Sequence, residues 1–219
     1  MKTSVHNLPL FTEGDKPSVH DPFFHETTAR KAGFDLIAGV DEAGRGPLAG
    51  PVAAAAVILP QGATLPGVKD SKQLTEKARE EAFSVIRQTA LAVSIGVVSH
   101  HFIDEFNILQ ASLEAMKRAV LSLGPAADYL LVDGIHAVPV PIPQRSLRKG
   151  DQRSLSISAA SVMAKVYRDR IMRSYDERFP EYGFRENKGY GTPKHLAALR
   201  RHGPCPVHRM TFKRVAEDK

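Results

Sequence analysis

The sequence has 219 residues, which is long enough for one domain with a full hydrophobic core and leaves little room for a second. Hydrophobic residues make up 42% and charged residues 25% of the chain, no apolar run approaches the roughly 20 residues that span a bilayer, and the single cysteine, Cys205, excludes an internal disulfide. The net charge of +6 is uneven: residues 1–140 carry 12 Lys/Arg against 16 Asp/Glu, whereas residues 141–219 carry 18 against 8. A basic C-terminal part of this kind favours binding to a polyanion such as nucleic acid.

The first 30 residues mix Pro, His, Asp and Thr without any period, which predicts a flexible N-terminal tail ahead of one domain at residues 31–219. The start of the sequence has no charged-then-apolar signal pattern, and a lone cysteine suits a reducing compartment. We therefore expect a cytoplasmic protein without a membrane segment, and we expect it to be a monomer.

From residue 34 onward, apolar runs of strand length alternate with segments of helical period. Thr75 is a candidate N-cap of the first long helix, and Gly124 is a candidate terminator of the second. The prolines in 137–143 leave a strand there doubtful, because proline cannot donate to a sheet ladder. The expected strands are 35–41, 52–59, 91–98, 129–132 and 137–143, and the expected helices are 75–88, 108–123, 156–178 and 193–201. This order predicts an α/β fold with a mixed central sheet flanked by helices.

Four acidic residues stand where strands end or helices begin. Asp41 and Glu42 follow the apolar run 36–40, Asp133 follows the run 129–132, and Asp151 precedes the long helix. Strand ends converge in open α/β sheets, and four carboxylates are hard oxygen ligands that suit Mg²⁺ or Mn²⁺ rather than zinc. Two such ions about 4 Å apart clamp the attacking and leaving oxygens in phosphoryl transfer.

The acidic pair has a geometric difficulty and a simpler interpretation. Adjacent residues on a regular strand point to opposite faces, so Asp41 and Glu42 share a site only if the strand ends or twists there. A glycine-flanked arginine, Gly44-Arg45-Gly46, follows at once and makes such a change of direction plausible. Taken alone, however, the segment is equally consistent with a polar hairpin turn.

Seven segments, in order, carry a resemblance to a known family. They are GVDEAGRGPLAGPV (39–52), KDSKQLTEKARE (69–80), FNILQASLEAMKRA (106–119), LLVDG (130–134), KGDQRSLSISAASVMAKVYRDR (149–170), NKGYGTPKHLAAL (187–199) and HRMTFKRV (208–215). Over residues 34–214 the chain resembles prokaryotic ribonuclease HII, a type 2 ribonuclease H. The resemblance implies a ribonuclease H-like fold with a small helical C-terminal extension.

The resemblance also implies roles for individual residues. Asp41, Glu42, Asp133 and Asp151 would be the catalytic quartet that binds two divalent ions, Mn²⁺ or Mg²⁺, during catalysis. Gly44, Arg45 and Gly46 would recognise the ribonucleotide, since backbone groups of a glycine loop can approach a 2′-OH that both donates and accepts. Tyr190 would pack on the sugar at the RNA–DNA junction. The residues expected near the substrate backbone are Ser71, Lys72, Lys165, Arg168, Lys188 and His195. Asp169, inside the long helix, suits a structural ion pair with a nearby arginine.

The implied reaction is hydrolysis on the 5′ side of ribonucleotides in RNA/DNA hybrids and of single ribonucleotides embedded in duplex DNA. It leaves 3′-hydroxyl and 5′-phosphate ends and serves ribonucleotide removal in DNA replication and repair. In the tail, Asn7-Leu8-Pro9-Leu10-Phe11 resembles the motif by which bacterial repair proteins dock on the replication sliding clamp, usually Gln-Leu-x-Leu-Phe. The present sequence departs from that motif at its first position.

Two alternatives were weighed against this interpretation. A ribonuclease HIII-like enzyme is disfavoured because Gly44-Arg45-Gly46-Pro47 fits the HII pattern and 30 leading residues cannot form an added substrate-binding domain. A non-catalytic nucleic-acid-binding module is disfavoured because all four quartet positions carry acids. The sequence leaves open the preference between Mg²⁺ and Mn²⁺ and between single ribonucleotides and long hybrids.

Overall fold

A five-stranded mixed sheet forms the centre of the protein in a computed structural model that describes residues 21–68 and 74–215. The strand order is β3-β2-β1-β4-β5, in which β1 pairs antiparallel with β2 and parallel with β4. The strands are β1 (Ile37–Ala43), β2 (Val52–Ile58), β3 (Ala92–Val98), β4 (Tyr129–Asp133) and β5 (Gln144–Leu147). The predicted mixed sheet is confirmed, and β1 lies at its middle with both of its edges paired.

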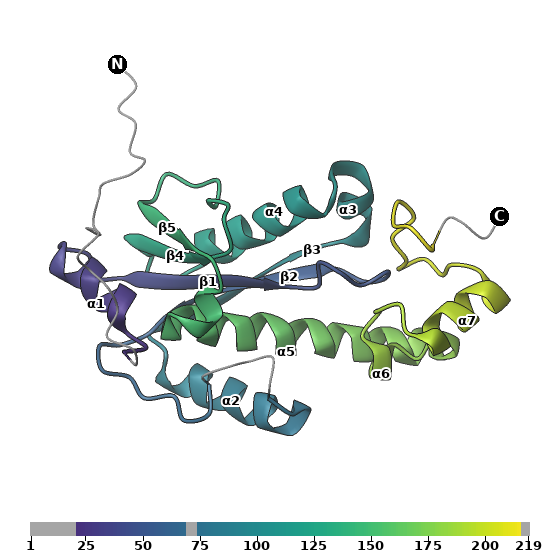
Figure 1. Ribbon diagram of the computed structural model, residues 1–219, viewed down its shortest axis with the longest axis horizontal. Helices are drawn as coiled ribbons and strands as arrows, with labels where there is room; N and C mark the ends of the chain where they lie inside the picture. Colours follow the sequence, from purple (N-terminus) through teal and green to yellow (C-terminus); the bar gives the residue numbers. More distant parts are fainter. Residues whose placement is uncertain (1–20, 69–73, 216–219) are drawn as a thin grey trace, which may run out of the picture.

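Helices cover both faces of the sheet, as Figure 1 shows. The long helix α5 (Leu155–Arg178) lies along β1 and β2, with α2 (Glu76–Thr89) packed outside it, and α4 (Ile108–Leu121) covers the other face beside α3 (His100–Phe106). Alternate residues of β2 serve the two faces: Ala54 and Ala56 pack toward α4, whereas Ala55 and Val57 pack toward α5. Small side chains on this strand let both helices approach the sheet closely.

Two glycines allow backbone to touch backbone between the layers. A Cβ on Gly39 in β1 would collide with the backbone of Ser156 and Ile157 in the first turn of α5. A Cβ on Gly96 in β3 would collide with the Ala115 carbonyl of α4. The first turn of α5 therefore packs directly against the backbone of β1 at Gly39, which lies two residues before Asp41.

The C-terminal part forms the predicted small helical extension at one end of the sheet (Figure 1). It contains α6 (Phe184–Asn187) and α7 (Pro193–His202), which begins after the N-cap Thr192 and ends at Gly203. A separate apolar cluster joins this extension to the loop between β1 and β2; its buried residues are Leu48, Ala49, Met172, Tyr182, Phe184, Leu199, Cys205, Val207 and Val215.

Several predicted boundaries were wrong for identifiable reasons. The expected tail of residues 1–30 is too long, because Phe24–Lys31 forms helix α1, whose buried Glu26 accepts hydrogen bonds from Ser154 and Ser156 at the beginning of α5. The doubtful strand at 137–143 is absent, and β5 begins at Gln144, just after the last proline of that segment. Helices α3 and α6 were not anticipated. Thr75 does cap α2, accepting from the Ala78 N–H.

Among the residues that the structure describes, no helix has the length and apolar character needed to cross a membrane.

Candidate active site

Asp41 and Glu42 lie on β1 and point to opposite faces of the sheet. The strand continues to Ala43, and across it Asp41 faces Ala55, on the α5 side, while Glu42 faces Ala54, on the α4 side. The expected end of the strand between the two acids is therefore wrong. Asp41 is only 4% exposed. Its carboxylate accepts a hydrogen bond of 2.7 Å from the backbone N–H of the next residue, Glu42.

The side chain of Asp133 is hydrogen-bonded to the residue that precedes Asp151. Asp133 ends β4, beside β1, and its Oδ1 accepts the Gly150 N–H at 2.6 Å. Gly150 opens the short 3₁₀ turn Gly150–Gln152, which carries the buried Asp151 into the beginning of α5. Residues far apart in the sequence are thus brought to the same end of the sheet, as predicted.

The acids influence one another's protonation. Burial, followed by the charges of Glu42 and Asp133, raises the pKa of Asp41 well above its usual range, against a smaller opposing effect of a hydrogen bond from Ser161. Burial is also the main cause that raises the pKa of Glu42; Arg45 opposes this shift and Asp133 adds to it. Three carboxylates therefore repel one another in a poorly hydrated place, which is the condition that a bound cation relieves.

The four carboxylates fit a hard divalent cation by donor chemistry, because oxygen is the only ligand atom that they offer. As the side chains lie, no group of three or more His, Cys, Asp or Glu residues within the described ranges is arranged as a ready-made metal cage.

A cavity opens beside these acids on the α4 face of the sheet. Arg45 stands at its edge with its side chain half exposed, and its Nη1 lies 3.3 Å from Glu42 Oε1. The cavity is lined by Glu42, Arg45, Leu109, Ser112, Leu113, Met116, Asp133, Gly134, Ile135 and His136. Acids from two strands and the arginine of the glycine loop thus face one space.

The glycine loop meets the predicted tyrosine. A Cβ placed on Gly46 would lie 3.5 Å from Tyr190 Cε1, and Tyr190 is 44% exposed. Lys165 Nζ lies 6.0 Å from the centre of the Tyr190 ring. Gly44 has φ +104°, and a Cβ there would collide with the Arg168 side chain, so glycine is required at this position. The structure therefore brings together the loop, Tyr190 and Lys165.

Two residues predicted to lie near the substrate backbone are buried instead. Arg168 is fully buried and donates to the carbonyls of Ala49, Pro51 and Lys188. His195 is also fully buried, with its Nδ1 at 2.9 Å from the Tyr190 carbonyl. Both side chains support the loop or Tyr190 from beneath, contrary to the prediction of a direct contact.

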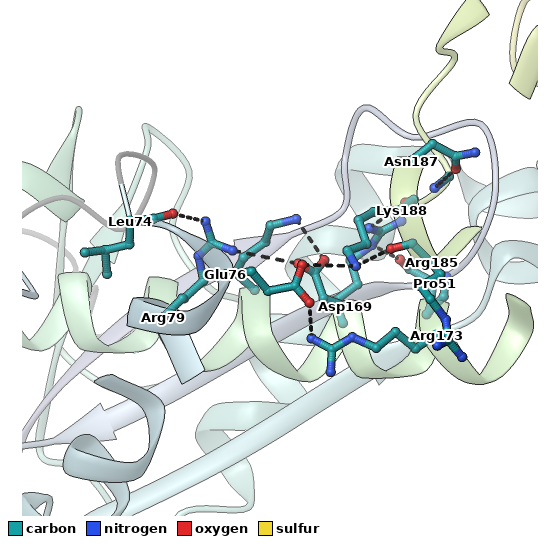
Figure 2. Close-up of polar contacts among 12 residues, drawn as sticks. Pro51, Leu74, Glu76, Arg79, Asp169, Arg173, Arg185, Asn187 and Lys188 are labelled. Atoms are coloured by element: carbon teal, nitrogen blue, oxygen red, sulfur yellow. Dashed lines mark hydrogen bonds and ion pairs between the residues drawn. The ribbon is translucent and has the colours of Figure 1, made fainter. Parts of the chain in front are cut away.

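Lys188 has a mainly internal set of contacts, shown in Figure 2. Its side chain is 11% exposed, and its Nζ donates to the Arg185 carbonyl and lies 3.7 Å from Glu76 of α2. Glu76 also binds Arg173 of α5, so this lysine belongs to a network that joins α2, α5 and α6. Asp169 forms the predicted ion pair with an arginine, Arg79, at 4.0 Å, and it also forms a shorter pair of 2.8 Å with Lys165, which was not predicted.

Three predicted features lie outside the described residues: Ser71, Lys72 and the motif in the N-terminal tail. One residue was missed. Arg209 is fully buried and donates to the carbonyls of Gly44 and Arg45. The segment HRMTFKRV contains this arginine, but the residue type alone favours a solvated surface charge, so no sequence signal assigned it to the loop.

Comparisons with known proteins identify the family of this chain. The family profile described as "Ribonuclease HII" matches residues 38–215. A "Ribonuclease HII" from Geobacter metallireducens is 55% identical over 210 residues, covering 96% of this chain and 97% of that protein.

Solved structures show the same relationship. Ribonuclease H2 from Pyrococcus horikoshii superposes with a TM-score of 0.73 at 28% identity, covering 84% of this chain and 97% of that one. RNase HII from Archaeoglobus fulgidus, solved in complex with PCNA, superposes with a TM-score of 0.70 at 28% identity, covering 82% and 96%. The predicted ribonuclease H-like fold is confirmed, and the chain belongs to the ribonuclease HII family, whose members are ribonuclease H endonucleases.

Proposed function

We propose that this enzyme hydrolyses the phosphodiester on the 5′ side of a ribonucleotide, both in RNA/DNA hybrids and at single ribonucleotides embedded in duplex DNA. The products carry 3′-hydroxyl and 5′-phosphate ends, and the enzyme acts as a cytoplasmic monomer in ribonucleotide removal during replication and repair. The observation that carries this proposal is the ion pair of 3.3 Å between Glu42 and Arg45, which joins the acidic cluster to the glycine loop.

Asp41, Glu42, Asp133 and Asp151 are the proposed ligands of Mg²⁺ or Mn²⁺. Two such ions would supply an activated water and would stabilise the leaving 3′ oxygen. The protein's part is to hold the acids at one end of the sheet, where β1, β4 and the turn before α5 meet. Arg45 neutralises Glu42 when no cation does so, and it can turn to a substrate phosphate once the acids are shared with metal.

The loop Gly44-Arg45-Gly46 is the proposed sensor of the 2′-OH. A hydroxyl is recognised by a fixed donor and a fixed acceptor, and a carbonyl oxygen has two lone pairs. The Arg45 carbonyl, which accepts from Arg209 at 3.0 Å, therefore has capacity for a second hydrogen bond from the sugar. Tyr190, next to Gly46, is the proposed platform for the adjoining deoxyribose, where a 2′-OH would obstruct packing.

Lys165 is the described basic residue best placed to contact the backbone near this junction. Its side chain is 28% exposed, and it stands beside Tyr190 while it remains paired with Asp169. Ser71, Lys72 and Lys188 are proposed to extend the contact with the phosphate backbone. Lys188 is the weakest of these, because its ammonium group already binds the Arg185 carbonyl.

A nicking assay tests the proposed reaction. The full chain is incubated with duplex DNA that contains one ribonucleotide, with Mg²⁺, with Mn²⁺, or with a chelator. We expect a single cut on the 5′ side of the ribonucleotide in either metal, no cut in chelator, and no cut in an all-deoxy duplex of the same sequence. Binding without metal-dependent cleavage would contradict the proposal and would favour the non-catalytic nucleic-acid-binding alternative.

We also propose that residues Leu8–Phe11 dock on the replication sliding clamp. The support is the motif itself and the archaeal relative that was solved in complex with PCNA. Deletion of residues 1–12 is expected to abolish clamp binding in a surface-immobilised clamp assay while leaving cleavage of a short duplex at its full rate. Unchanged clamp affinity of the deleted protein would refute this partner.

A further inference from the structure

The guanidinium of Arg209 donates its hydrogen bonds to backbone carbonyls of the loop between β1 and β2. Its Nε donates to Gly50 at 3.0 Å, and its Nη1 donates to Arg45 at 3.0 Å. Its Nη2 donates to Gly44 at 2.6 Å and to Pro51 at 3.3 Å. The side chain is fully buried, so these contacts are made away from bulk water. One guanidinium thus holds both ends of the loop that includes the proposed ribose sensor.

This arrangement is costly to build. Burial and the neighbouring Arg168 lower the pKa of Arg209 to about 9, which still leaves the guanidinium charged at neutral pH. Within the described ranges, no carboxylate lies within ion-pair distance of it, and Asp104 acts only through the longer-range field. A buried charge is tolerated only when its donors are satisfied, and here four carbonyls satisfy them. The positions of these loop carbonyls therefore depend on the position of the planar Arg209 guanidinium.

The segment that carries Arg209 also fixes Tyr190. The Gly50 N–H donates to Val207, and the Arg209 N–H donates to Leu48, both at 2.8 Å. The residue before Arg209, His208, contacts His195 through their Nε2 atoms at 3.0 Å, and His195 in turn contacts the Tyr190 carbonyl through its Nδ1. One short stretch of the C-terminal extension therefore holds both the proposed ribose sensor and the proposed platform for the adjoining deoxyribose.

We propose that Arg209 is a positioning residue for ribose recognition, fixing the carbonyls of Gly44 and Arg45 so that the 2′-OH meets a preformed acceptor. This inference rests on the proposed function of the loop. Arginine suits the task because its planar fork presents five donors in fixed directions. Lysine keeps the charge but has one nitrogen, which cannot reach the Gly44, Arg45 and Gly50 carbonyls together.

The test compares binding of two duplexes that differ only in one 2′-OH. Both are measured in the Asp41→Asn background, in which cleavage is expected to be lost, and the selectivity is the ratio of the two dissociation constants. Arg209→Lys is expected to lower this ratio roughly tenfold, the equivalent of about one hydrogen bond, while affinity for the all-deoxy duplex stays within about twofold. In the active background, the same change should lower kcat/KM for the ribonucleotide-containing duplex.

A matched control separates positioning from general stability. Ile58 is fully buried at the end of β2 opposite the loop, so Ile58→Ala should lower the melting temperature without changing the selectivity ratio. If Arg209→Lys fails to fold, the selectivity ratio is measured in the Asp104→Ala variant instead. The Asp104 carboxylate accepts from the Met210 and Thr211 N–H groups, so its removal should loosen the segment next to Arg209 and lower the ratio in the same direction.

The outcomes are distinct. If the wild-type chain makes no cut beside a ribonucleotide, the proposed function itself fails. If the wild type cuts and a folded Arg209→Lys variant keeps the full selectivity ratio, only the positioning role is overturned. An unchanged ratio in Asp104→Ala overturns it when Arg209→Lys does not fold.

Discussion

Asp41→Asn is expected to abolish cleavage, by at least about 10³-fold, and at the same time to raise the melting temperature of the metal-free protein at neutral pH. The loss follows because an amide removes an anionic ligand from the acidic cluster. The gain follows because Asp41 is buried beside Glu42 and Asp133, and both burial and those charges disfavour its ionised form. For a domain of this size, each kcal/mol of stability shifts the melting temperature by about 2–4 °C.

The pH dependence of this gain has a definite sign. Because the pKa of Asp41 is higher in the folded than in the unfolded protein, the folded state binds more protons between the two pKa values. Metal-free wild-type protein therefore loses stability as the pH rises through this range. Asparagine does not titrate, so the difference in melting temperature between variant and wild type should grow from acidic to neutral pH.

Added metal and a second variant complete this test. Mn²⁺ should raise the melting temperature of the wild type more than that of Asp41→Asn, because the variant lacks one ligand. Asp169→Asn is the control, because we expect it to lower the melting temperature where Asp41→Asn raises it. Asp169 is equally buried but pairs with Lys165 and Arg79, so its neutralisation should destabilise the protein. Retained cleavage by Asp41→Asn would show that the assignment of this ligand is wrong.

Gly39→Ala is expected to have the largest effect on folding, with a loss of more than about 3 kcal/mol in the free energy of unfolding. The added Cβ would collide with the backbone of Ser156 and Ile157, and a backbone atom cannot rotate away as a side chain can. Gly39 also pairs with Val57 on one side and Leu131 on the other, so β1 cannot shift alone. The displacement must pass to α5 and to the turn that carries Asp151.

Chemical denaturation of Gly39→Ala and Gly62→Ala measures this effect. Gly62 has open space around its Cβ position but a φ of +73°, so alanine there should cost only about 1 kcal/mol of backbone strain. The comparison isolates the collision between layers from the general cost of replacing glycine. Equal losses in the two variants would contradict the proposed contact between β1 and α5.

Local sequence signals predicted most of the sheet and the long helices. Apolar runs located β2 and β3 closely, and the Thr75 cap and the Pro193 start located α2 and α7. Helix α1 was not predicted because its N-cap makes no side-chain hydrogen bond, and because its buried Glu26 finds its hydrogen-bond donors in Ser154 and Ser156, about 130 residues away. Partners so distant in the chain cannot be identified from the residues around Glu26.

Site residues could be predicted from the sequence where their place at a strand end or in a motif determined their location. They could not be predicted where burial of the side chain determined their role. The position of Asp133 at a strand end indicated that it would lie near the acids on β1, and the structure places it close enough to raise the pKa of Asp41. The structure also places Tyr190 beside Gly46, two residues that the ordered motifs had both assigned to the substrate. Arg168 and Arg209 were different, because a basic residue in a sequence is normally assigned to the surface. Their partners are carbonyl groups, which every residue possesses, so no sequence pattern could identify them.

The loop at residues 44–51 is synthesised early, but its hydrogen-bond partners come late in the chain. Its carbonyls accept from Arg168 and Arg209, and its N–H groups donate to the Gly189 and Val207 carbonyls. On the ribosome, all four carboxylates have been made by residue 151, whereas the groups that fix the loop arrive in the final quarter of the chain. A nascent chain therefore contains all four acids well before it contains the groups that hold the proposed ribose-sensing loop. If the proposed roles are right, we expect ribose selectivity to be the last property that the growing enzyme acquires.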